Sequence, residues 1–299
     1  MFFFNTKNMD KSQQPLVSWA GGKSKLIPEI AKLLPKDIKS YDTYIEPFIG
    51  GGALLFKKLI SYPFKQKVIG DINEPLINIY KEVKANREEV LTLTKEIQKE
   101  LKIMNDVEKK AYYYKLRETW NECKDLTNTE RAALMLYLTR NSFCGLWRIN
   151  TKGKMDIAFG RASENMDLRN VIVKYSNHLK KIDIYTGDYK QSKQYIKGKT
   201  LIYFDPPYRP ISDTSKHNRY VKEEFTDKEQ TELALYCKEL DTLGVKWILS
   251  NSDPKNTNKE DNFFDDLYKD FKIKRIKVKR LLGDKEARGE VTELLITNV

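Results

Sequence analysis

Histidine and cysteine are scarce in this chain, which has two of the first and three of the second among its 299 residues. The cysteines Cys123, Cys144 and Cys237 show neither paired nor CxxC spacing, which argues against a disulfide framework and a thiolate metal site. The histidines His178 and His217 are too few for most sets of metal ligands. We therefore expect no bound metal, and a cytoplasmic protein in a reducing, intracellular setting.

Long hydrophobic runs are also missing. The apolar stretch at residues 1–4 is far too short for the core of a signal peptide, and no basic segment precedes it. No segment approaches the roughly 20 apolar residues of a membrane-spanning helix, so we expect no membrane partner. We find no internal repeat or low-complexity tract, and the length favours one large domain carrying an insertion.

Positive charge, in contrast, is abundant. The sequence contains 54 Lys and Arg against 42 Asp and Glu, which gives a net charge of +12 and an isoelectric point near 9.3. This balance favours a polyanionic partner such as nucleic acid, although many basic proteins are merely soluble. The hydrophobic fraction of 40%, with 17 Tyr and 13 Phe, supplies enough apolar side chains for a core.

Strand-like apolar segments alternate with helical patterns along most of the chain. We expect strands near residues 43–46, 67–70, 182–186, 200–204 and 245–250, and helices from about Ala53, from Glu74, and from a capping box at 226–229 to Gly244. This βαβα order predicts a mostly parallel α/β sheet whose ligand site lies at the carboxyl ends of the strands. Residues 272–278 and 291–297 predict a closing hairpin joined by a polar loop at 283–290.

Residues 86–181 interrupt this alternation. They are helical in pattern and highly charged, and they include a stretch rich in Gly, Asn and Arg at 141–160. A departure of this length within a βαβ array is typical of an inserted domain. We predict a sheet domain made of residues 1–85 and 182–299, with a mainly helical domain at 86–181.

The tetrapeptide Asp205-Pro206-Pro207-Tyr208 follows the strand predicted at 200–204. A carboxylate at a strand end can accept one hydrogen of an exocyclic amine, and the Pro206 carbonyl can accept the other. Two prolines stiffen the turn, and the Tyr208 ring offers a stacking face for a base lifted out of a duplex. The pattern therefore indicates chemistry on a nucleobase, with a proline-rich loop after a buried strand as the alternative.

The segment EPFIGGG at residues 46–52 stands between a predicted strand and a predicted helix. Its glycines let a ligand approach the backbone closely, but the spacing does not match GxGxxG, so a dinucleotide is not implied. Asp71, about twenty residues further at the next strand end, stands where an acidic residue usually holds ribose hydroxyls. A tight turn followed by a helix cap is the alternative.

The segment WAGGKS at residues 19–24 ends like a P-loop, but Val17 stands where the Walker pattern requires glycine. Phosphate binding is therefore a minor alternative. A Gly-Gly turn between Trp19 and Lys23 suits an aromatic wall and one cation at the mouth of a pocket, or simply a helix entry with Pro28 in its first turn.

Asp188 follows the strand predicted at 182–186, so Asp71, Asp188 and Asp205 are each expected at a strand end along one edge of the sheet. In that row they suit a cofactor ribose, a cofactor adenine and a substrate amine respectively. Any one of them alone could equally cap a helix.

Six segments occur in one order: WAGGK at 19–23, EPFIGGG at 46–52, DINEPL at 71–76, GDY at 187–189, DPPY at 205–208 and LSNS at 249–252. With these motifs the chain, from about Leu16 to Asn298, resembles the Dam-type DNA adenine methyltransferases, closest to the GATC-specific enzymes of restriction-modification systems. The resemblance implies a Rossmann-like catalytic domain that binds S-adenosylmethionine, a target-recognition domain at 86–181, and methylation of the N6 amine of a flipped adenine in duplex DNA.

The same resemblance assigns roles to single residues. It implies catalysis by Asp205, Pro206 and Tyr208, and cofactor contacts from Trp19, Lys23, Phe48, Gly50, Gly52, Asp71, Asp188, Tyr189 and Asp205. It implies DNA contacts from Asn141, Phe143, Leu146, Arg148 and Asn150, with Lys285 and Arg288 as phosphate contacts.

Within the segment at 141–148, Phe143 and Leu146 would wedge into the base stack and Arg148 would read a guanine, which implies GATC as the target. Two departures from the family's pattern bear on this target: Ser18 stands where relatives often have Lys, and MDIA at 155–158 replaces a Phe-Asn-Val-Pro run. A glycine-rich loop packed on its own lobe is the alternative for this segment.

Two other functions stay open at this point. A methyltransferase acting on RNA or on a protein glutamine amide uses a related tetrapeptide, although the inserted domain favours DNA. The second is a catalytically silent DNA-binding module, against which the intact Asp205 and Tyr208 argue. We further expect a monomer, with a restriction endonuclease that cuts the same sequence as its partner.

Overall fold

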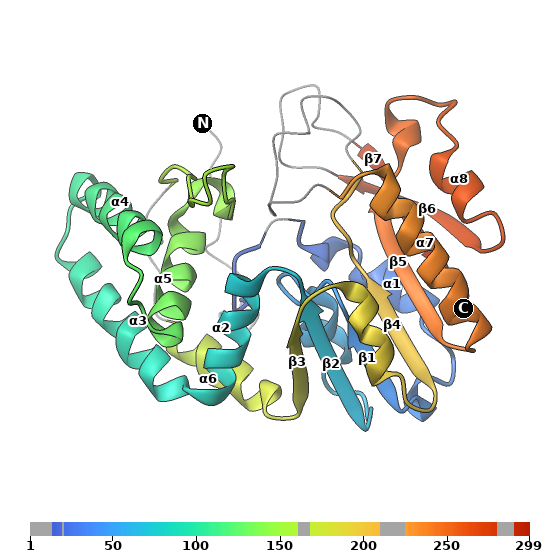
Figure 1. Cartoon of the computed structure of the whole chain (residues 1–299), viewed down its shortest axis with the longest axis horizontal. Helices are drawn as coiled ribbons and strands as arrows, with labels where there is room; N and C mark the ends of the chain where they lie inside the picture. The colour runs from blue at the N-terminus through green and yellow to red at the C-terminus, as the bar shows by residue number, and fades with distance from the viewer. Residues whose placement is uncertain (1–13, 20, 161–167, 210–224, 280–289) are drawn as a thin grey trace. The chain divides into compact units, whose positions relative to one another are not determined.

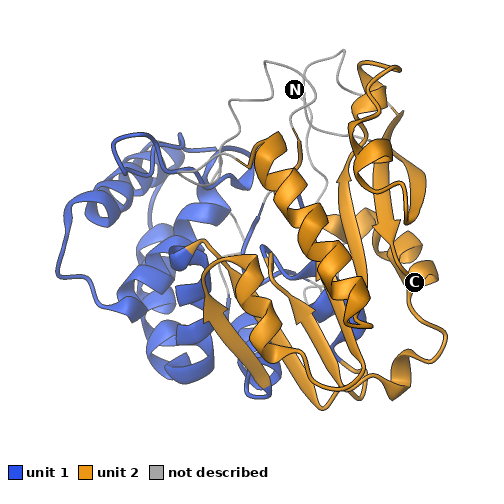
Figure 2. Ribbon diagram, turned by 45° about the vertical axis from the view of Figure 1, so that its right-hand side comes forward, with its two compact units in different colours: residues 1–22, 50–60, 74–181 blue, residues 23–49, 61–73, 182–299 orange. Residues whose placement is uncertain are grey.

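The computed structural model describes residues 14–19, 21–160, 168–209, 225–279 and 290–299 (Figure 1). The chain divides into two compact units (Figure 2). The helical unit comprises residues 1–22, 50–60 and 74–181, and the sheet unit comprises residues 23–49, 61–73 and 182–299.

The sheet unit is built on a sheet with the strand order β3-β2-β1-β4-β5-β7-β6 within the described residues. The strands are β1 (Thr43–Glu46), β2 (Gln66–Asp71), β3 (Ile182–Thr186), β4 (Thr200–Phe204), β5 (Lys246–Ser252), β6 (Lys272–Lys279) and β7 (Glu290–Thr297). Strands β1 to β5 pair in parallel, whereas β7 is antiparallel to both of its neighbours. This arrangement confirms the predicted Rossmann-like sheet, with an antiparallel strand added near one edge.

The two central strands have an apolar character that explains their position. Every residue of β1 and β4 is buried, because helices and loops cover both faces of a parallel sheet. Their register is regular, with Thr43 opposite Thr200 and Ile45 opposite Ile202. The sequence order reverses between β1 and β4, and the carboxyl ends of strands at such a reversal are where open α/β sheets bind ligands.

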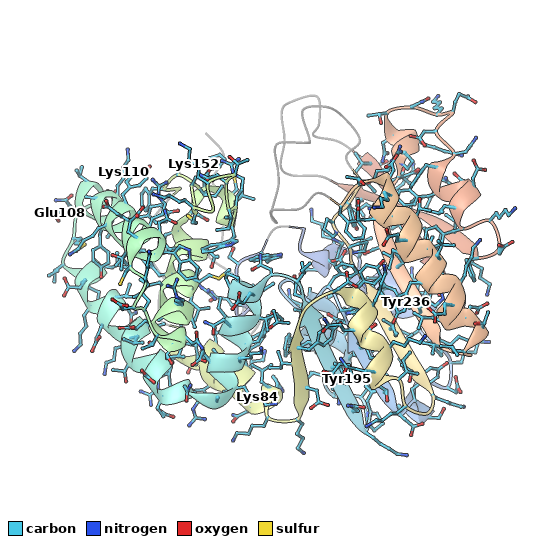
Figure 3. The ribbon with its side chains drawn as sticks, viewed as in Figure 1. Lys84, Glu108, Lys110, Lys152, Tyr195 and Tyr236 are labelled. Atoms are coloured by element: carbon cyan, nitrogen blue, oxygen red, sulfur yellow. The ribbon has the colours of Figure 1, made fainter. Side chains whose placement is uncertain are left out.

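Helix α7 (Asp227–Thr242) covers one face of this sheet, the near face in Figure 1. It begins with the predicted capping box of Thr226 and Glu229, and Gly244, with a φ of 74°, follows its end. Its apolar side Leu233, Cys237 and Leu240 packs in one core with residues of β4 and β5. Tyr236, labelled in Figure 3, shares a hydrogen bond of 2.9 Å with the hydroxyl of Ser192. The sheet unit also contains α1 (Ile27–Leu33) and α8 (Phe263–Leu267).

The predicted closing hairpin is present as β6 and β7. The two strands pair antiparallel from Lys272 opposite Thr297 to Lys279 opposite Glu290. The connecting residues 280–289 lie outside the described part of the chain, and with them Lys285 and Arg288.

The helical unit contains α2 (Glu74–Ala85), α3 (Arg87–Lys102), α4 (Asp106–Glu122), α5 (Asn128–Asn141) and α6 (Arg169–Leu179), with a π-helical turn at Leu55–Leu59. Helix α5 is the centre of this unit: it is buried nearly all round and packs against α2, α3 and α4. The unit includes the whole of residues 86–181 and extends beyond them to α2 and two short segments. That residues 86–181 recognise the target remains a prediction.

Candidate active site

Asp205 lies at the carboxyl end of β4, where the strand order of the sheet reverses. Its Oδ1 is 2.9 Å from Nζ of Lys23 and accepts a hydrogen bond of 2.8 Å from the hydroxyl of Ser250. The Tyr203 hydroxyl lies 2.9 Å from that of Ser250. Since Ser250 donates to Asp205, Tyr203 donates to Ser250, and a chain of hydrogen bonds leads from the buried sheet to the carboxylate.

The pKa of the Asp205 carboxyl reflects two opposing effects. Burial raises it, whereas the positive charge of Lys23 and the hydrogen bonds from Lys23 and Ser250 lower it. Burial is the larger effect, so the pKa lies above the ordinary aspartate value of 3.8. The carboxylate is consequently a stronger hydrogen-bond and proton acceptor than a solvated aspartate.

Tyr208 completes the predicted tetrapeptide and has two partners. Nζ of Lys23 lies 4.2 Å from the centre of its ring, and its hydroxyl donates a hydrogen bond of 2.9 Å to Oε2 of Glu293 on β7. Burial raises the pKa of Tyr208 well above its ordinary value, so the phenol stays neutral. Glu293 cannot be identified from the sequence, because it lies far from the tetrapeptide in the chain and only the sheet brings the two together.

A row of acidic residues follows the carboxyl edge of the parallel strands. The strand order gives the sequence Asp188, Asp71, Glu46 and Asp205, so β1 places a fourth carboxylate between two of the predicted three. Glu46 is 2% exposed and accepts a hydrogen bond of 2.5 Å from the Tyr44 hydroxyl. Its motif was recognised in the sequence, but no role was assigned to it.

Asp71 and Asp188 also act as local caps. Oδ1 of Asp71 accepts a hydrogen bond of 3.0 Å from the backbone N–H of Asn73, and Oδ1 of Asp188 accepts one of 2.8 Å from that of Lys190. Asp188 is thus the N-cap of the 3-10 helix Tyr189–Tyr195, whereas Asp71 closes the turn before α2, which begins at Glu74. A carboxylate has two oxygens with several acceptor positions, so a cap is compatible with a ligand contact, and these contacts remain predictions.

Phe48 and Tyr189 pack on each other, with ring centres 5.4 Å apart and planes inclined by 28°. Phe48 also contacts the edges of Phe204 and Phe225, and Tyr189 is 6% exposed. The two rings thus form an apolar wall continuous with the core of the sheet unit, directly after β1 and β3. Their predicted contact with the cofactor stays untested.

The glycine turn and Trp19 belong to the helical unit and lie against each other. A Cβ atom on Gly50, whose φ is 46°, would lie 3.1 Å from the Trp19 ring, and one on Gly51 would lie 3.4 Å from Cβ of Trp19. Gly52 has a φ of 65°, and the Tyr80 hydroxyl donates a hydrogen bond of 2.8 Å to the Gly50 carbonyl. The positive φ values and the close indole explain why this turn requires glycine.

Arg140 at the end of α5 holds the segment before Trp19. Its Nη2 donates hydrogen bonds of 2.9 Å and 2.7 Å to the carbonyls of Pro15 and Leu16. Burial lowers the pKa of its guanidinium to about 10, which still leaves the side chain charged at neutral pH. This arginine cannot be found from the sequence, because no local pattern indicates that its partners are backbone carbonyls more than a hundred residues away.

The segment predicted to recognise DNA is an antiparallel hairpin in the helical unit. Ser142 bridges Phe159 and Ile149 bridges Met155. Phe143 is 59% exposed, as expected of a residue that meets a partner. Helix α4 supports the hairpin by donating hydrogen bonds from three side chains to its carbonyls: Tyr113 and Arg117 to Ile157, and Asn121 to Met155.

Arg148 in this hairpin is paired with Asp156 on the opposite side. Its Nε lies 2.9 Å from Oδ1 and its Nη2 lies 3.0 Å from Oδ2, a bidentate pair that fixes the plane of the guanidinium. Asp156 is part of the MDIA segment that departs from the family's pattern. A residue at which this chain differs from the family's pattern therefore binds Arg148, the side chain that we expect to read a base.

The other predicted DNA contacts have different surroundings. Asn141 is fully buried: its side chain donates a hydrogen bond of 2.8 Å to the Tyr137 carbonyl within α5, and its own carbonyl accepts one of 2.9 Å from the backbone N–H of Gly160. Oδ1 of Asn150 accepts from the backbone N–H groups of Lys152 and Lys154 and shapes the turn. Leu146 is half-buried. DNA contacts by all three remain predictions.

The described residues contain no group of three or more His, Cys, Asp or Glu side chains placed to hold a metal ion. Within the same residues, no helix has the length and apolar character needed to cross a membrane.

Comparison with known proteins agrees with this geometry. The chain is 37% identical over 296 residues to "Type II methyltransferase M.MjaIII" of Methanocaldococcus jannaschii, covering 95% of this chain and 99% of that protein. It is 35% identical over 292 residues to "Type II methyltransferase M1.LlaDCHI" of Lactococcus lactis subsp. cremoris, and 28% identical over 286 residues to "DNA adenine methylase" of Escherichia coli K12, with 95% of each chain covered in both cases.

A family profile matches most of the chain as well. The match extends over residues 19–282 and includes the WAGGK segment, the glycine turn, the helical unit from α2 onwards and the tetrapeptide after β4. The chain therefore belongs to the family of D12 class N6 adenine-specific DNA methyltransferases.

Proposed function

We propose that this adenine-specific DNA methyltransferase acts on the adenine of GATC in duplex DNA and that it flips this base out of the helix. Membership of the family implies S-adenosylmethionine as the methyl donor. The GATC target is supported by the hairpin segment at 141–148, which carries Phe143, Leu146 and Arg148 in the order of the Dam-type enzymes.

The observation that carries the chemistry is the placement of Asp205 at the strand reversal, next to the Pro206 carbonyl and the Tyr208 ring. Hydrogen bonds from the adenine amine to the Asp205 carboxylate and the Pro206 carbonyl would localise the nitrogen lone pair that the ring otherwise delocalises. Tyr208 would stack on the flipped base, with its phenol anchored by Glu293. Asp205, with its raised pKa, is the acceptor in reach for the proton that the amine loses.

The residues of the chain suit the cofactor. Bound S-adenosylmethionine would supply an electrophilic methyl group on its sulfonium. Asp71 would bind the ribose hydroxyls and Asp188 the adenine amine, each from a strand end. The glycine turn offers bare backbone at Gly50 and Gly52, and further contacts would come from Trp19, Lys23, Phe48, Tyr189 and Asp205.

The helical insert at 86–181 would recognise the DNA. Phe143 and Leu146 would occupy the space left by the flipped base, and Arg148 would bind the O6 and N7 acceptors of a guanine. Asn141 and Asn150 would add further DNA contacts from the same hairpin. Lys285 and Arg288 would bind phosphates and so contribute to affinity and not to sequence preference.

Mapping N6-methyladenine by sequencing DNA from cells that express the protein tests this proposal. We expect modification at GATC on both strands, and none in cells that express the Asp205→Ala variant. Methylation confined to another sequence would refute the target while leaving the chemistry intact.

One partner protein and an oligomeric state complete the proposal. Two relatives above 30% identity are named type II methyltransferases, which supports a restriction endonuclease that cuts the same site. Protection of the host DNA from a GATC-cutting endonuclease would support it. We also propose a reducing, intracellular setting. We further propose that the protein acts as a monomer, which light scattering with and without a GATC duplex would test.

A further inference from the structure

The backbone of the catalytic turn after β4 is held by side chains from two other elements of the sheet unit. Nε2 of Gln230 on α7 donates a hydrogen bond of 3.0 Å to the Pro207 carbonyl. Oδ1 of Asn251 on β5 accepts one of 3.1 Å from the backbone N–H of Arg209. These two contacts bracket Tyr208 and lie directly beyond the Pro206 carbonyl.

The two amides are bonded to each other and shielded from solvent. Nδ2 of Asn251 donates a hydrogen bond of 3.0 Å to Oε1 of Gln230, and both side chains are 0% exposed. Ser252 adds a third contact, because its hydroxyl donates a hydrogen bond of 2.7 Å to the Arg209 carbonyl. Buried polar groups of this kind persist only where every member has a partner, and here the partners include the backbone of the turn.

Arg209 secures the far end of the same turn. Its Nε and Nη2 bind both carboxylate oxygens of Asp227 at 2.7 Å and 3.0 Å, and its Nη1 binds Asp261 at 2.6 Å. The guanidinium also lies 4.4 Å from the centre of the Phe263 ring. Asp227 is the first residue of α7, the helix that carries Gln230, so one helix fixes the turn at two points.

The chemistry of proline explains why the turn needs such support. Pro206 and Pro207 have no backbone N–H, so neither can donate a hydrogen bond that would fix its position. The backbone groups that can still form hydrogen bonds in this turn are its carbonyls and the N–H groups of the residues after Pro207. The Gln230 amide binds the first carbonyl beyond Pro206, and the Asn251 amide binds the N–H of Arg209.

We propose that Gln230 and Asn251 are positioning residues for methyl transfer: they hold the Pro207–Arg209 backbone so that the Pro206 carbonyl and the Asp205 carboxylate face the target amine together. The proposal rests on the proposed roles of Asp205 and Pro206. Both amide side chains are 0% exposed and contact the turn itself, so their effect would act on turnover through the position of the turn.

Two substitutions at Gln230 and one matched control test the proposal. Gln230→Leu removes both hydrogen-bonding groups, while Gln230→Glu keeps an acceptor for Asn251 and replaces only the donor to Pro207. The control is Thr297→Val, which removes a buried hydrogen bond of 2.6 Å from the Thr297 hydroxyl to the Trp247 carbonyl, away from the turn. For each protein, kcat, the dissociation constant of S-adenosylmethionine and the thermal unfolding midpoint are measured.

We expect kcat to fall about 10- to 100-fold in both Gln230 variants, because misplacement of a reacting group by about 1 Å has an effect of that size. Cofactor affinity should change less than threefold, and the control should lose stability while its kcat stays within twofold. Adding Asn251→Leu to Gln230→Leu should lower kcat little further, because the two amides act as one unit.

Three results would overturn the proposal. One is a folded Gln230→Leu protein with kcat within twofold of the parent. Another is a loss of kcat in Thr297→Val that matches the loss in the Gln230 variants at equal stability. The third is a loss of cofactor affinity that accounts for the whole effect. Failure of the Asp205 assignment is distinguishable, because it would leave the Asp205→Ala protein active.

Discussion

Nζ of Lys23 lies 2.9 Å from Oδ1 of Asp205 and 4.2 Å from the centre of the Tyr208 ring. One cation thus contacts both the carboxylate and the aromatic face of the proposed reaction site. The side chains of Lys23 and Asp205 are 10% and 21% exposed, so solvent screens this pair less than a surface pair. The charge of Lys23 therefore keeps the buried carboxylate ionised to a lower pH than burial alone would allow.

Asp205→Ala should abolish methyl transfer, because no other acidic side chain in the tetrapeptide can accept the amine hydrogen. Asp205→Asn tests the charge alone, since asparagine has nearly the same shape and keeps an acceptor oxygen but cannot take up a proton. We expect both to be inactive in a tritium-transfer assay. Turnover within tenfold of the parent, in a protein of unchanged unfolding midpoint, would refute the role of this carboxylate.

Lys23→Met should move the acidic limb of the pH profile of kcat/KM to higher pH. Burial raises the pKa of Asp205 and Lys23 opposes this rise, so removing the lysine raises the pKa further. Because the reaction requires the carboxylate, activity should then be lost at a higher pH as the solution is acidified. The surface control Lys32→Met, which breaks only the pair with Glu29, should leave the profile in place. An unshifted profile in Lys23→Met would contradict the coupling.

Asp71→Ala should weaken binding of S-adenosylmethionine by about 1.5–3 kcal/mol, the usual contribution of hydrogen bonds to a charged group. The structure provides a control that separates cofactor binding from the cap. Asp71→Asn keeps an oxygen for the backbone N–H of Asn73 but loses the charge. Calorimetry should show weak binding for both variants. Full affinity in Asp71→Asn would mean that the carboxylate serves only as a cap.

Arg148→Ala should raise methylation at sites with a wrong outer base relative to GATC, because a bidentate contact with guanine contributes about 1–3 kcal/mol of discrimination. Asp156→Ala should also raise methylation at these sites, but by less, since the Arg148 guanidinium loses the carboxylate that fixes its plane. Lys152→Ala, in the same hairpin, is the control for a phosphate contact: it should weaken binding to all sequences alike and lower the slope of the salt dependence by about one unit. A parallel fall at all sites in Arg148→Ala, with a shallower salt dependence, would identify Arg148 as a phosphate contact.

Cys144→Asn should stabilise the hairpin. Cys144 has a φ of 55° and a ψ of 19°, the left-handed conformation that asparagine adopts more readily than other non-glycine residues. The side chain is exposed, so the exchange leaves no cavity. We expect a gain of about 0.5–1 kcal/mol, a part of the roughly 1–3 kcal/mol that such a conformation costs. An unchanged or lower unfolding midpoint would show that the turn stores no strain at this residue.

Local sequence was sufficient for the elements whose signal is contained in a short segment. The strands at 43–46, 182–186 and 200–204 have the predicted bounds. For 43–46 and 200–204 the reason is that strands covered on both faces are short buried runs that end at polar or turn residues, whereas 182–186 is a half-buried edge strand that ends at the turn of Gly187. Helix α7 was equally clear from its capping box and the glycine beyond its end. The motif order identified the family, because reactions on a nucleobase require particular groups at particular strand ends.

The tertiary structure alone decided which distant side chains meet. Lys23 reaches Asp205, Glu293 anchors Tyr208, and the Gln230 amide binds the Pro207 carbonyl, yet no partner lies in the same segment. The burial of Asn141 was also decided by the tertiary structure, because its polar side chain lies at the end of a helix that other helices surround. Periodicity indicates which face of an element is apolar but not which element covers it. Contacts of this kind follow from strand order and helix packing, which depend on the whole chain at once.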